Sequence, residues 1–183
     1  MAGGKGGAPG VSLMTNVVFG TTGSGGFAES LVYGADNGAH ISSNSWGYTI
    51  PNVYESSVLA AIDYCDDSGT IVVFAAGNDG TNEYWYPAYY STAIAVGATT
   101  DSGEAAWFTN YGNWVDISGP GYDVTSTVSV AEGSYGAYSG TSMACPHVAG
   151  VLALGKSYLF NKSNDEVSTR TIYVTLFPPL NSH

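Results

Sequence analysis

The sequence predicts an α/β fold in which a parallel β-sheet is covered by helices on both faces. Strand-like segments alternate with amphipathic helical segments through the first half of the 183-residue chain, and this order builds parallel sheets. Residues 70–76 are an almost unbroken apolar run, typical of a strand covered on both sides. With 44% hydrophobic and 10% charged residues, and neither an internal repeat nor a dividing linker, residues 1–183 are predicted to form one domain.

The first elements are predicted from apolar spacing and from the glycines between them. Residues 12–19 are mostly apolar or β-branched and lie between glycines, which predicts a strand. After a Gly-rich turn, residues 27–37 place apolar side chains at positions i, i+4 and i+8, which predicts a helix that ends at Asn37-Gly38. Residues 41–46 are predicted to form the second strand.

The rest of the chain continues this alternation. A second amphipathic helix is predicted to end at 68–69 and to bury Val58, Leu59, Ile62 and Cys65. Residues 93–98 and 114–118 are predicted strands, and the glycines and proline of 119–121 are expected to close the second of them. A capping box predicts a last helix over 163–174, because Glu stands three residues after Ser at its start.

Charge and apolar run length argue against two classes of partner. The chain has 4 Lys+Arg against 15 Asp+Glu, a formal net charge of −11, so its surface repels phosphate backbones and nucleic-acid binding is not expected. No membrane association is expected, because no apolar run is long enough to cross a bilayer; residues 1–10 also lack the apolar middle of a signal peptide. Cys65 and Cys145 show no metal-ligand spacing, and the sequence leaves open whether they pair.

The chain is organised around residues 140–150, Gly-Thr-Ser-Met-Ala-Cys-Pro-His-Val-Ala-Gly, a loop that runs into a helix. Gly140 permits a tight turn, Ser142 stands where an N-cap hydroxyl is expected, and Pro146 falls in the predicted first turn. The apolar residues that follow predict a helix buried all round. N–H groups at the start of such a helix can bind an oxyanion as well as a cap. Ser142 is therefore either a nucleophile or only a helix cap.

This string resembles, residue for residue, the nucleophile motif of the subtilisin-like serine proteases, the subtilases. The resemblance covers nearly the whole chain and implies a subtilisin-like, Rossmann-like three-layer fold that is N-terminally incomplete. It implies that Ser142 is the acyl-forming nucleophile of a serine endopeptidase acting on polypeptide substrates, and that His147 is a structural residue of the helix. An extracellular or cell-surface location is also implied by the family.

Residues 75–80, directly after the buried strand, resemble a second subtilase element. Polar groups beyond the carboxyl ends of parallel strands commonly form binding sites. Gly-Asn-Asp-Gly is also ordinary turn chemistry, so a plain turn is the alternative. The resemblance implies that the Asn78 amide donates to the oxyanion together with the Ser142 backbone N–H. It also implies three substrate-binding residues in this stretch, Ala75, Ala76 and Gly77.

Two further segments resemble the two edges of the subtilase substrate groove. They are Ser24, Gly25 and Gly26 on one side and Ser45, Trp46 and Gly47 on the other. Their backbone is expected to pair with an extended substrate by strand addition. The alternatives are a plain turn for the Gly-rich segment and a core position for Trp46. Trp85 and Tyr86 resemble the stretch nearest the floor of the primary specificity pocket.

Asp116 is the candidate metal ligand. Together with the backbone of residues 91–93 it resembles a weak cation site of the family, in which one carboxylate and main-chain carbonyls bind the ion. Oxygen ligands of this kind suit calcium, so a structural calcium ion is considered. A solvated carboxylate at a strand end is the alternative. The acyl-transfer chemistry itself requires no cofactor.

The catalytic Asp and His of the family have no counterpart in the expected place. Subtilases carry the Asp in a D-[ST]-G motif and the His in H-G-T-H, both ahead of the strand predicted at 12–19, and neither motif occurs there. Asp36 and His40 precede Ser142 in the required order, but they lie on a helix-to-strand connection where the family uses no catalytic group. We therefore expect the later two-thirds of a catalytic domain, lacking the N-terminal part of its own domain.

A serine without a base retains only an oxyanion hole and a binding groove. The leading hypothesis is the C-terminal part of a subtilisin-like serine endopeptidase, with this chain alone inactive. The alternative hypothesis is a non-catalytic, peptide-binding protease homologue.

Overall fold

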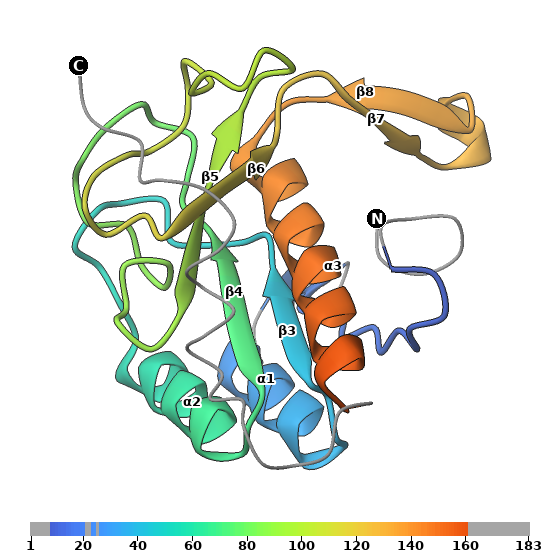
Figure 1. Ribbon diagram of the computed structural model, residues 1–183. Helices are drawn as coiled ribbons and strands as arrows, with labels where there is room; N and C mark the ends of the chain where they lie inside the picture. The colour runs from blue at the N-terminus through green and yellow to red at the C-terminus, as the bar shows by residue number, and fades with distance from the viewer. Residues whose placement is uncertain (1–7, 21–22, 25, 161–183) are drawn as a thin grey trace.

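The computed structural model describes residues 8–20, 23–24 and 26–160. At its centre is a four-stranded parallel sheet with the strand order β3-β4-β5-β6 (Figure 1). The strands are β3 (Ile41–Asn44), β4 (Ile71–Ala75), β5 (Ile94–Thr99) and β6 (Ile117–Pro120). All four run in the same direction, so their carboxyl ends lie at one edge of the sheet.

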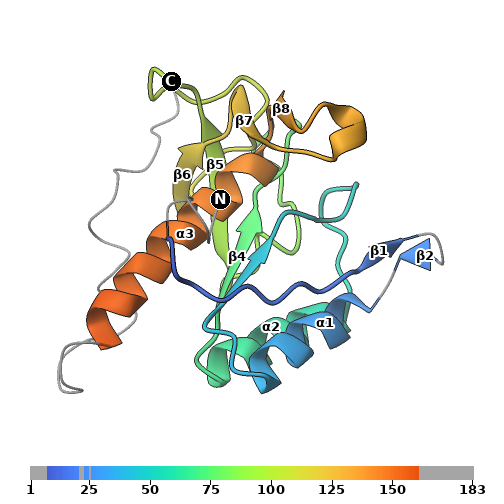
Figure 2. The ribbon, with the colours of Figure 1, turned by 90° about the vertical axis from the view of Figure 1, so that its right-hand side faces the viewer.

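Helices cover both faces of this sheet. α1 (Phe27–Asp36) and α2 (Ser56–Asp67) pack against each other on one face, and α3 (Thr141–Phe160) lies across the other. Figure 2 shows the three layers, with α1 and α2 on one side of the strands and α3 on the opposite side. The predicted α/β architecture with helices on both faces is confirmed.

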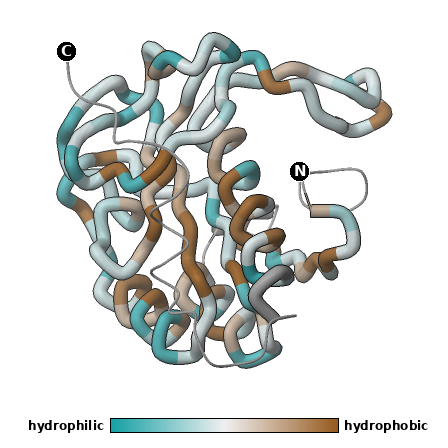
Figure 3. The backbone as a smooth tube through the Cα atoms, viewed as in Figure 1, coloured by the Kyte–Doolittle hydropathy of each residue, from teal (hydrophilic) through white to brown (hydrophobic). Residues whose placement is uncertain are grey.

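β4 shows why both faces need cover. Ile71 and Val73 pack into the hydrophobic cluster beneath α3, whereas Val72 and Phe74 pack into the cluster beneath α1 and α2. All four side chains are buried, because successive side chains of a strand point to opposite faces. In Figure 3 hydrophobic residues accordingly concentrate on the central strands and on the helices beside them.

Two short hairpins lie outside the central sheet. They are β1 (Phe19–Gly20) with β2 (Gly23–Ser24), and β7 (Val124–Thr127) with β8 (Tyr135–Tyr138), the second enclosing the 3₁₀ turn η1 (Val130–Glu132). The β7-β8 hairpin projects from the body of the molecule just ahead of α3 (Figure 1).

Glycines end α1 and α2 where the sequence predicts. Asn37 follows α1, and Gly38 then adopts a φ of 78°. Gly69 adopts a φ of 79° just after α2. A residue with a Cβ is strained at such angles, so glycine sets both helix ends.

The strand predicted at residues 12–19 is wrong. Only Phe19 belongs to a strand, and it pairs with β2 in the first hairpin. Residues 11–18 are irregular; Asn16 Nδ2 donates to the carbonyl of Ser30, and Val17 is 82% exposed. The composition suits a pleated strand, but a strand needs a neighbour to complete its hydrogen bonds. In the described part of the chain, β3 pairs with β4 alone.

The last strand of the sheet lies later than the predicted 114–118. Gly119 and Pro120, expected to close the strand, belong to β6 itself. Proline is tolerated there because β6 is an edge strand. Glycine at 119 has a packing reason, since a Cβ would lie 3.1 Å from the carbonyl oxygen of Ala144 in α3. The close approach of helix and strand therefore explains this glycine better than turn chemistry does.

The start of α3 differs from the prediction. The helix begins at Thr141, so Ser142 is its second residue and not its N-cap, and Pro146 lies in the second turn. The first N–H of the helix is bonded instead by a distant side chain, because the Thr141 N–H donates to Asn78 Oδ1 at 2.8 Å. The helix is also not buried all round, since Leu154 is 49% exposed.

Pro146 leaves one helix carbonyl without its usual partner. In a regular helix the N–H of residue 146 would donate to the Ser142 carbonyl, but proline has no N–H. The Ser45 hydroxyl donates to that carbonyl instead, at 2.9 Å. A side chain just after β3 thus replaces the missing backbone bond and joins the sheet to the start of α3.

Both cysteines are free, which answers the question that the sequence leaves open. Cys65 lies in the cluster beneath α1 and α2, and Cys145 in the cluster beneath α3, so the sheet separates them. Burial raises the pKa of both thiols, which keeps them protonated and unreactive at neutral pH.

The helix predicted over 163–174 lies outside the described residues. Of the helices that are described, none combines the length and the apolar character that a bilayer crossing requires.

Two glycines allow a matched test of how closely α3 packs on the sheet. A Cβ on Gly121 would lie 2.6 Å from the Ala98 Cβ and 2.8 Å from the Gly140 carbonyl, whereas one on Gly150 would have no neighbour within 4 Å. We expect Gly121→Ala to lower the free energy of unfolding by about 1–3 kcal/mol and Gly150→Ala to raise it by about 0.5–1 kcal/mol. Equilibrium denaturation measures both, and equal effects would contradict the packing.

The bond between Ser45 and the Ser142 carbonyl allows a double-mutant test. We expect Ser45→Ala to lower the free energy of unfolding by about 1 kcal/mol, because that carbonyl loses its donor. In the Pro146→Ala background, the new N–H of residue 146 can donate to the Ser142 carbonyl. Ser45→Ala should then lower the free energy of unfolding by less than half as much. Urea denaturation of the four proteins measures the coupling. Strictly additive effects would show that the two residues do not share the carbonyl.

Candidate active site

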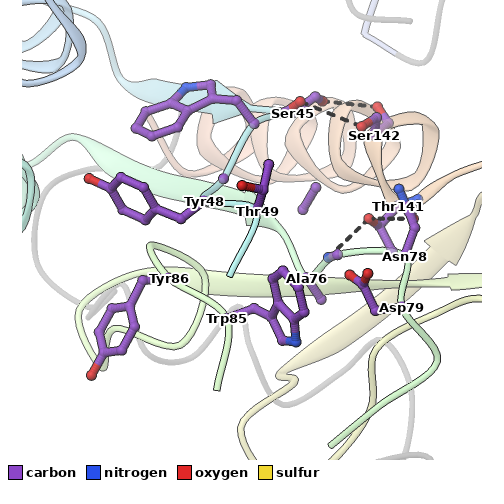
Figure 4. Close-up of a pocket in the computed structure, with 14 residues that line it drawn as sticks. Ser45, Tyr48, Thr49, Ala76, Asn78, Asp79, Trp85, Tyr86, Thr141 and Ser142 are labelled. Carbon is purple, nitrogen blue, oxygen red and sulfur yellow. Dashed lines mark hydrogen bonds between the residues drawn. The ribbon is translucent and has the colours of Figure 1, made fainter. Parts of the chain in front are cut away.

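Residues from four segments meet where the carboxyl ends of β3 and β4 reach the start of α3. They surround a cavity of about 340 Å³ (Figure 4). Its walls come from the segments after β3 and β4, from the loop before β5 and from the first turn of α3. Crevices at the carboxyl ends of parallel strands are common binding sites in α/β folds.

Most of the residues predicted from the sequence line this one cavity. They are Ser45, Trp46, Gly47, Ala75, Ala76, Gly77, Asn78 and Ser142. The segment predicted for the other edge of the groove is described only in part. Ser24 belongs to β2, and Gly26, which precedes α1, is not among the residues that line the cavity. Gly25 lies outside the described residues.

Asn78 is held in place by Thr141. Asn78 Oδ1 accepts hydrogen bonds from the Thr141 backbone N–H at 2.8 Å and from the Thr141 hydroxyl at 2.9 Å (Figure 4). The same hydroxyl accepts the Gly77 N–H at 3.1 Å. Because Oδ1 takes both bonds, the orientation of the amide is determined and its NH₂ group remains as a donor. Thr141 is part of the motif, one residue before the predicted nucleophile, but the sequence does not reveal its orienting role.

Ser142 combines a hydroxyl with a helix N-terminus. Its Oγ lies 3.5 Å from the Ser45 carbonyl oxygen, a long contact that leaves the hydroxyl available for chemistry. Its backbone N–H is among the first of α3, which have no intrahelical acceptor and lie at the positive end of the helix dipole. Together with the Asn78 amide, this N–H can stabilise an oxygen that becomes negatively charged in the cavity.

Asn110 supports the loop that carries Asn78, and no sequence pattern identifies it. It is 1% exposed; its Oδ1 accepts the Asp79 N–H, and its Nδ2 donates to the Ala76 carbonyl, both at 2.9 Å. Gly77 has a φ of 104°, and a Cβ there would collide with the Asn110 amide. These partners are 31 and 34 positions away from Asn110, so a local motif could not reveal them.

The aromatic residues divide between the core and the cavity. Trp46 lies at the cavity edge, but its ring packs on Phe27 and Phe74, with ring centroids 4.5 and 5.0 Å away. The Trp46 side chain is thus partly buried against the core cluster, while the residue also lines the cavity. Trp85 and Tyr86, expected near the floor of the specificity pocket, do line the cavity, as do the unpredicted Tyr48, Thr49 and Asp79 (Figure 4).

Among the residues that the structure describes, no histidine lines the cavity. His147 Nδ1 lies 2.8 Å from the Met143 carbonyl oxygen one turn earlier in α3, which assigns the proton to Nδ1 and directs the ring along its own helix. His40 precedes β3 and so lies at the amino end of the sheet, opposite to Ser142. Neither histidine is placed to accept a proton from Ser142.

Asp36 and the aspartates of the two Asp-Ser-Gly triplets lie away from the cavity. Asp36 Oδ1 accepts the Tyr64 hydroxyl at 2.6 Å, on the face covered by α1 and α2. Asp-Ser-Gly triplets occur at 67–69 and 101–103, but the first ends α2 and the second forms a turn after β5. Neither triplet lines the cavity.

The carboxylate of Asp116 is bonded to the sheet. Its Oδ2 accepts the Ala95 N–H at 2.8 Å, and its own N–H donates to the Ala95 carbonyl at 3.1 Å. Desolvation raises the pKa of this carboxyl, and the hydrogen bond from Ala95 lowers it in part. In the described chain no three His, Cys, Asp or Glu side chains gather to hold a metal. A calcium ion at Asp116 would therefore depend on backbone carbonyls for most of its ligands.

The sequence profile of the subtilase family matches residues 1–176. Thermitase of Thermoactinomyces vulgaris is 41% identical over 160 residues, 86% of this chain and 56% of its own length. Subtilisin Savinase of Lederbergia lenta is 38% identical over 163 residues, 87% of this chain and 59% of its own length. Alkaline elastase YaB of Bacillus sp. strain YaB is 40% identical over 163 residues, 87% of this chain and 42% of its own length. The chain thus spans about half the length of these relatives.

Solved structures show the same fold. The prenylagaramide maturation protease PagA superposes with a TM-score of 0.70 at 29% identity, over 79% of this chain and 54% of its own. A cold adapted subtilisin-like serine proteinase superposes with a TM-score of 0.65 at 31% identity, over 77% of this chain and 52% of its own. By sequence profile, by identity and by fold, the chain belongs to the subtilase family.

Proposed function

We propose that this chain is part of a subtilisin-like serine endopeptidase in which Ser142 attacks the peptide carbonyl. The observation that carries the proposal is the shared cavity, where the Asn78 amide, oriented by Thr141, lines the same space as Ser142. Attack by the Ser142 hydroxyl turns the carbonyl oxygen into an anion. Donors that are already oriented stabilise this anion without further reorganisation.

The proposed substrate is an extended polypeptide. Ser45 and Gly47 follow β3 and border the cavity, so their backbone is open to an added strand. A Cβ on Gly47 would lie 3.1 Å from the Tyr86 carbonyl oxygen, which explains a glycine at this edge. Residues 24–26 are proposed for the other side of the peptide on the resemblance alone.

The catalytic base is proposed to come from a polypeptide segment outside this chain. A serine hydroxyl needs a base to lose its proton, and the described residues place none beside Ser142. We infer that the missing N-terminal part of the domain supplies the Asp and His, and that this chain alone is inactive. The edge of β3, together with the exposed Val151 and Leu154 of α3, offers a surface for that part.

The same absence of a base favours a second candidate function. A non-catalytic, peptide-binding homologue would use the groove and the oxyanion donors without needing proton transfer. The two candidates differ in whether Ser142 can be activated, and a reagent specific for activated serines distinguishes them.

Two further proposals follow from the family. One is an extracellular or cell-surface location. The other is a structural calcium ion at Asp116 and the backbone of residues 91–93, with no part in the acyl-transfer chemistry.

A fluorophosphonate probe tests whether Ser142 can be activated. We expect no labelling of this chain alone, and labelling when the amino-terminal portion of thermitase is added to supply a base. Ser142→Ala should abolish that labelling, and Asn78→Ala should slow it by about 10²–10³-fold, the loss that removal of the oxyanion asparagine causes in subtilisin.

Labelling of the unmixed chain that disappears in Ser142→Ala would show that the chain contains its own base. No labelling in the mixture would favour the non-catalytic alternative.

Asp116 gives a pH-dependent test of stability. Because folding raises its pKa above the ordinary 3.8, the protonated form is favoured in the folded state, and stability is lost as the pH rises through the folded pKa. Asp116→Asn keeps an acceptor for the Ala95 N–H and removes the charge. In EDTA we expect the variant to melt above the wild type at pH 7, with the difference vanishing below the ordinary pKa.

Added calcium should raise the melting temperature of the wild type and not that of Asp116→Asn. Equal calcium shifts in both proteins would contradict the proposed calcium site.

A further inference from the structure

The cavity beside Ser142 carries one formal charge, and that charge is negative. Asp79 is the only Asp or Glu among its lining residues, and no Lys, Arg or His lines it in the described chain. The Asp79 backbone N–H donates to Asn110 Oδ1, but its carboxylate makes no hydrogen bond or ion pair with any residue that the structure describes. Asp79 Oδ2 lies 3.7 Å from the position that a Cβ on Gly77 would take, so the carboxylate lies beside Gly77, which lines the cavity.

Aromatic residues also line the cavity, although the Tyr86 ring itself packs on Tyr54 and Tyr89, with ring centroids 5.0 and 5.4 Å away. Trp85 and Tyr86 line the cavity, and Figure 4 shows the Trp85 indole and the Asp79 carboxylate in its wall. Trp85 Nε1 and Tyr48 Oη are buried side-chain atoms without a hydrogen-bond partner, and both residues line this cavity. The indole N–H can only donate, so its partner on binding would be a carbonyl oxygen of the peptide or a water and not the cation itself.

We propose that this cavity receives a basic side chain, lysine or arginine, from the residue before the peptide bond that Ser142 attacks. The inference rests on the proposed function and names its substrate class. A cation here would meet the Asp79 carboxylate and the face of the Trp85 ring. Carboxylates and aromatic faces both attract cations, and the flat guanidinium of arginine can contact both at once.

The charge of the whole chain acts in the same direction. With 4 Lys+Arg against 15 Asp+Glu, the formal net charge of −11 favours the approach of basic peptides. A crevice lined by one sign of charge focuses this field. An acidic side chain in the same cavity would face the Asp79 carboxylate with no compensating cation from the described residues.

Peptide binding tests the proposal without requiring catalysis. Fluorescein-labelled tetrapeptides with identical first three residues and C-terminal arginine, citrulline or leucine are titrated against the full chain by anisotropy at low salt. Citrulline matches the shape of arginine but has no charge. We expect the arginine peptide to bind about tenfold more tightly than the citrulline peptide, a factor typical of an exposed ion pair combined with a cation–π contact.

Three variants locate the source of this preference. Asp79→Asn should reduce the affinity ratio of the arginine peptide to the citrulline peptide to about twofold. Trp85→Leu should also reduce this ratio, but added salt should still weaken binding of the arginine peptide, because the Asp79 charge remains. Glu83→Gln is the matched control, because Glu83 is an exposed carboxylate of the same loop that does not line the cavity. It should leave the ratio unchanged. Circular dichroism verifies that each variant is folded.

The outcomes separate this inference from the proposed function. Equal binding of the arginine and citrulline peptides, or a preference that survives Asp79→Asn, would overturn the basic-side-chain inference and leave the peptide groove intact. Failure of all three peptides to bind would overturn both. A preference lost in Asp79→Asn and kept in Glu83→Gln would support the inference.

Discussion

The pair of hydrogen bonds from Thr141 to Asn78 Oδ1 is the interaction on which the site depends. It joins the loop after β4 to the first residue of α3, 63 positions later. The bonds stabilise the helix start, which has no cap of its own, and they orient the Asn78 amide with its NH₂ group as the remaining donor. One contact therefore links helix stability to the chemistry of the cavity, so a change at Thr141 affects both.

The second constraint is the close approach of α3 to the sheet. A Cβ on Gly121 would lie 2.6 Å from the Ala98 Cβ and 3.3 Å from the Ala144 Cβ, and a Cβ on Gly119 would lie 3.1 Å from the Ala144 carbonyl oxygen. Pro146 removes one helix hydrogen bond near this contact, and Ser45 replaces it from the end of β3. Backbone positions at the cavity are consequently held by rigid elements, which is the condition that oxyanion stabilisation requires.

In the proposed function, the site separates two requirements of serine catalysis. The proposed oxyanion donors and the proposed peptide edge come from β3, β4 and α3, whereas no histidine lines the cavity beside Ser142 among the described residues. Binding and charge stabilisation are thus independent of proton transfer in this part of the fold. This agrees with a chain that spans about half the length of the subtilases to which it is similar.

The three layers, the C-terminal ends of α1 and α2, and the string around Ser142 could be predicted from the sequence, because periodicity, glycine positions and a long motif are local properties. Tertiary structure alone decided the rest. Residues 12–18 are not a strand, because strand pairing depends on a neighbour that local composition does not specify. Thr141, Asn110 and Asp79 acquire their places at the site from contacts between distant segments, which no pattern in a short window can encode.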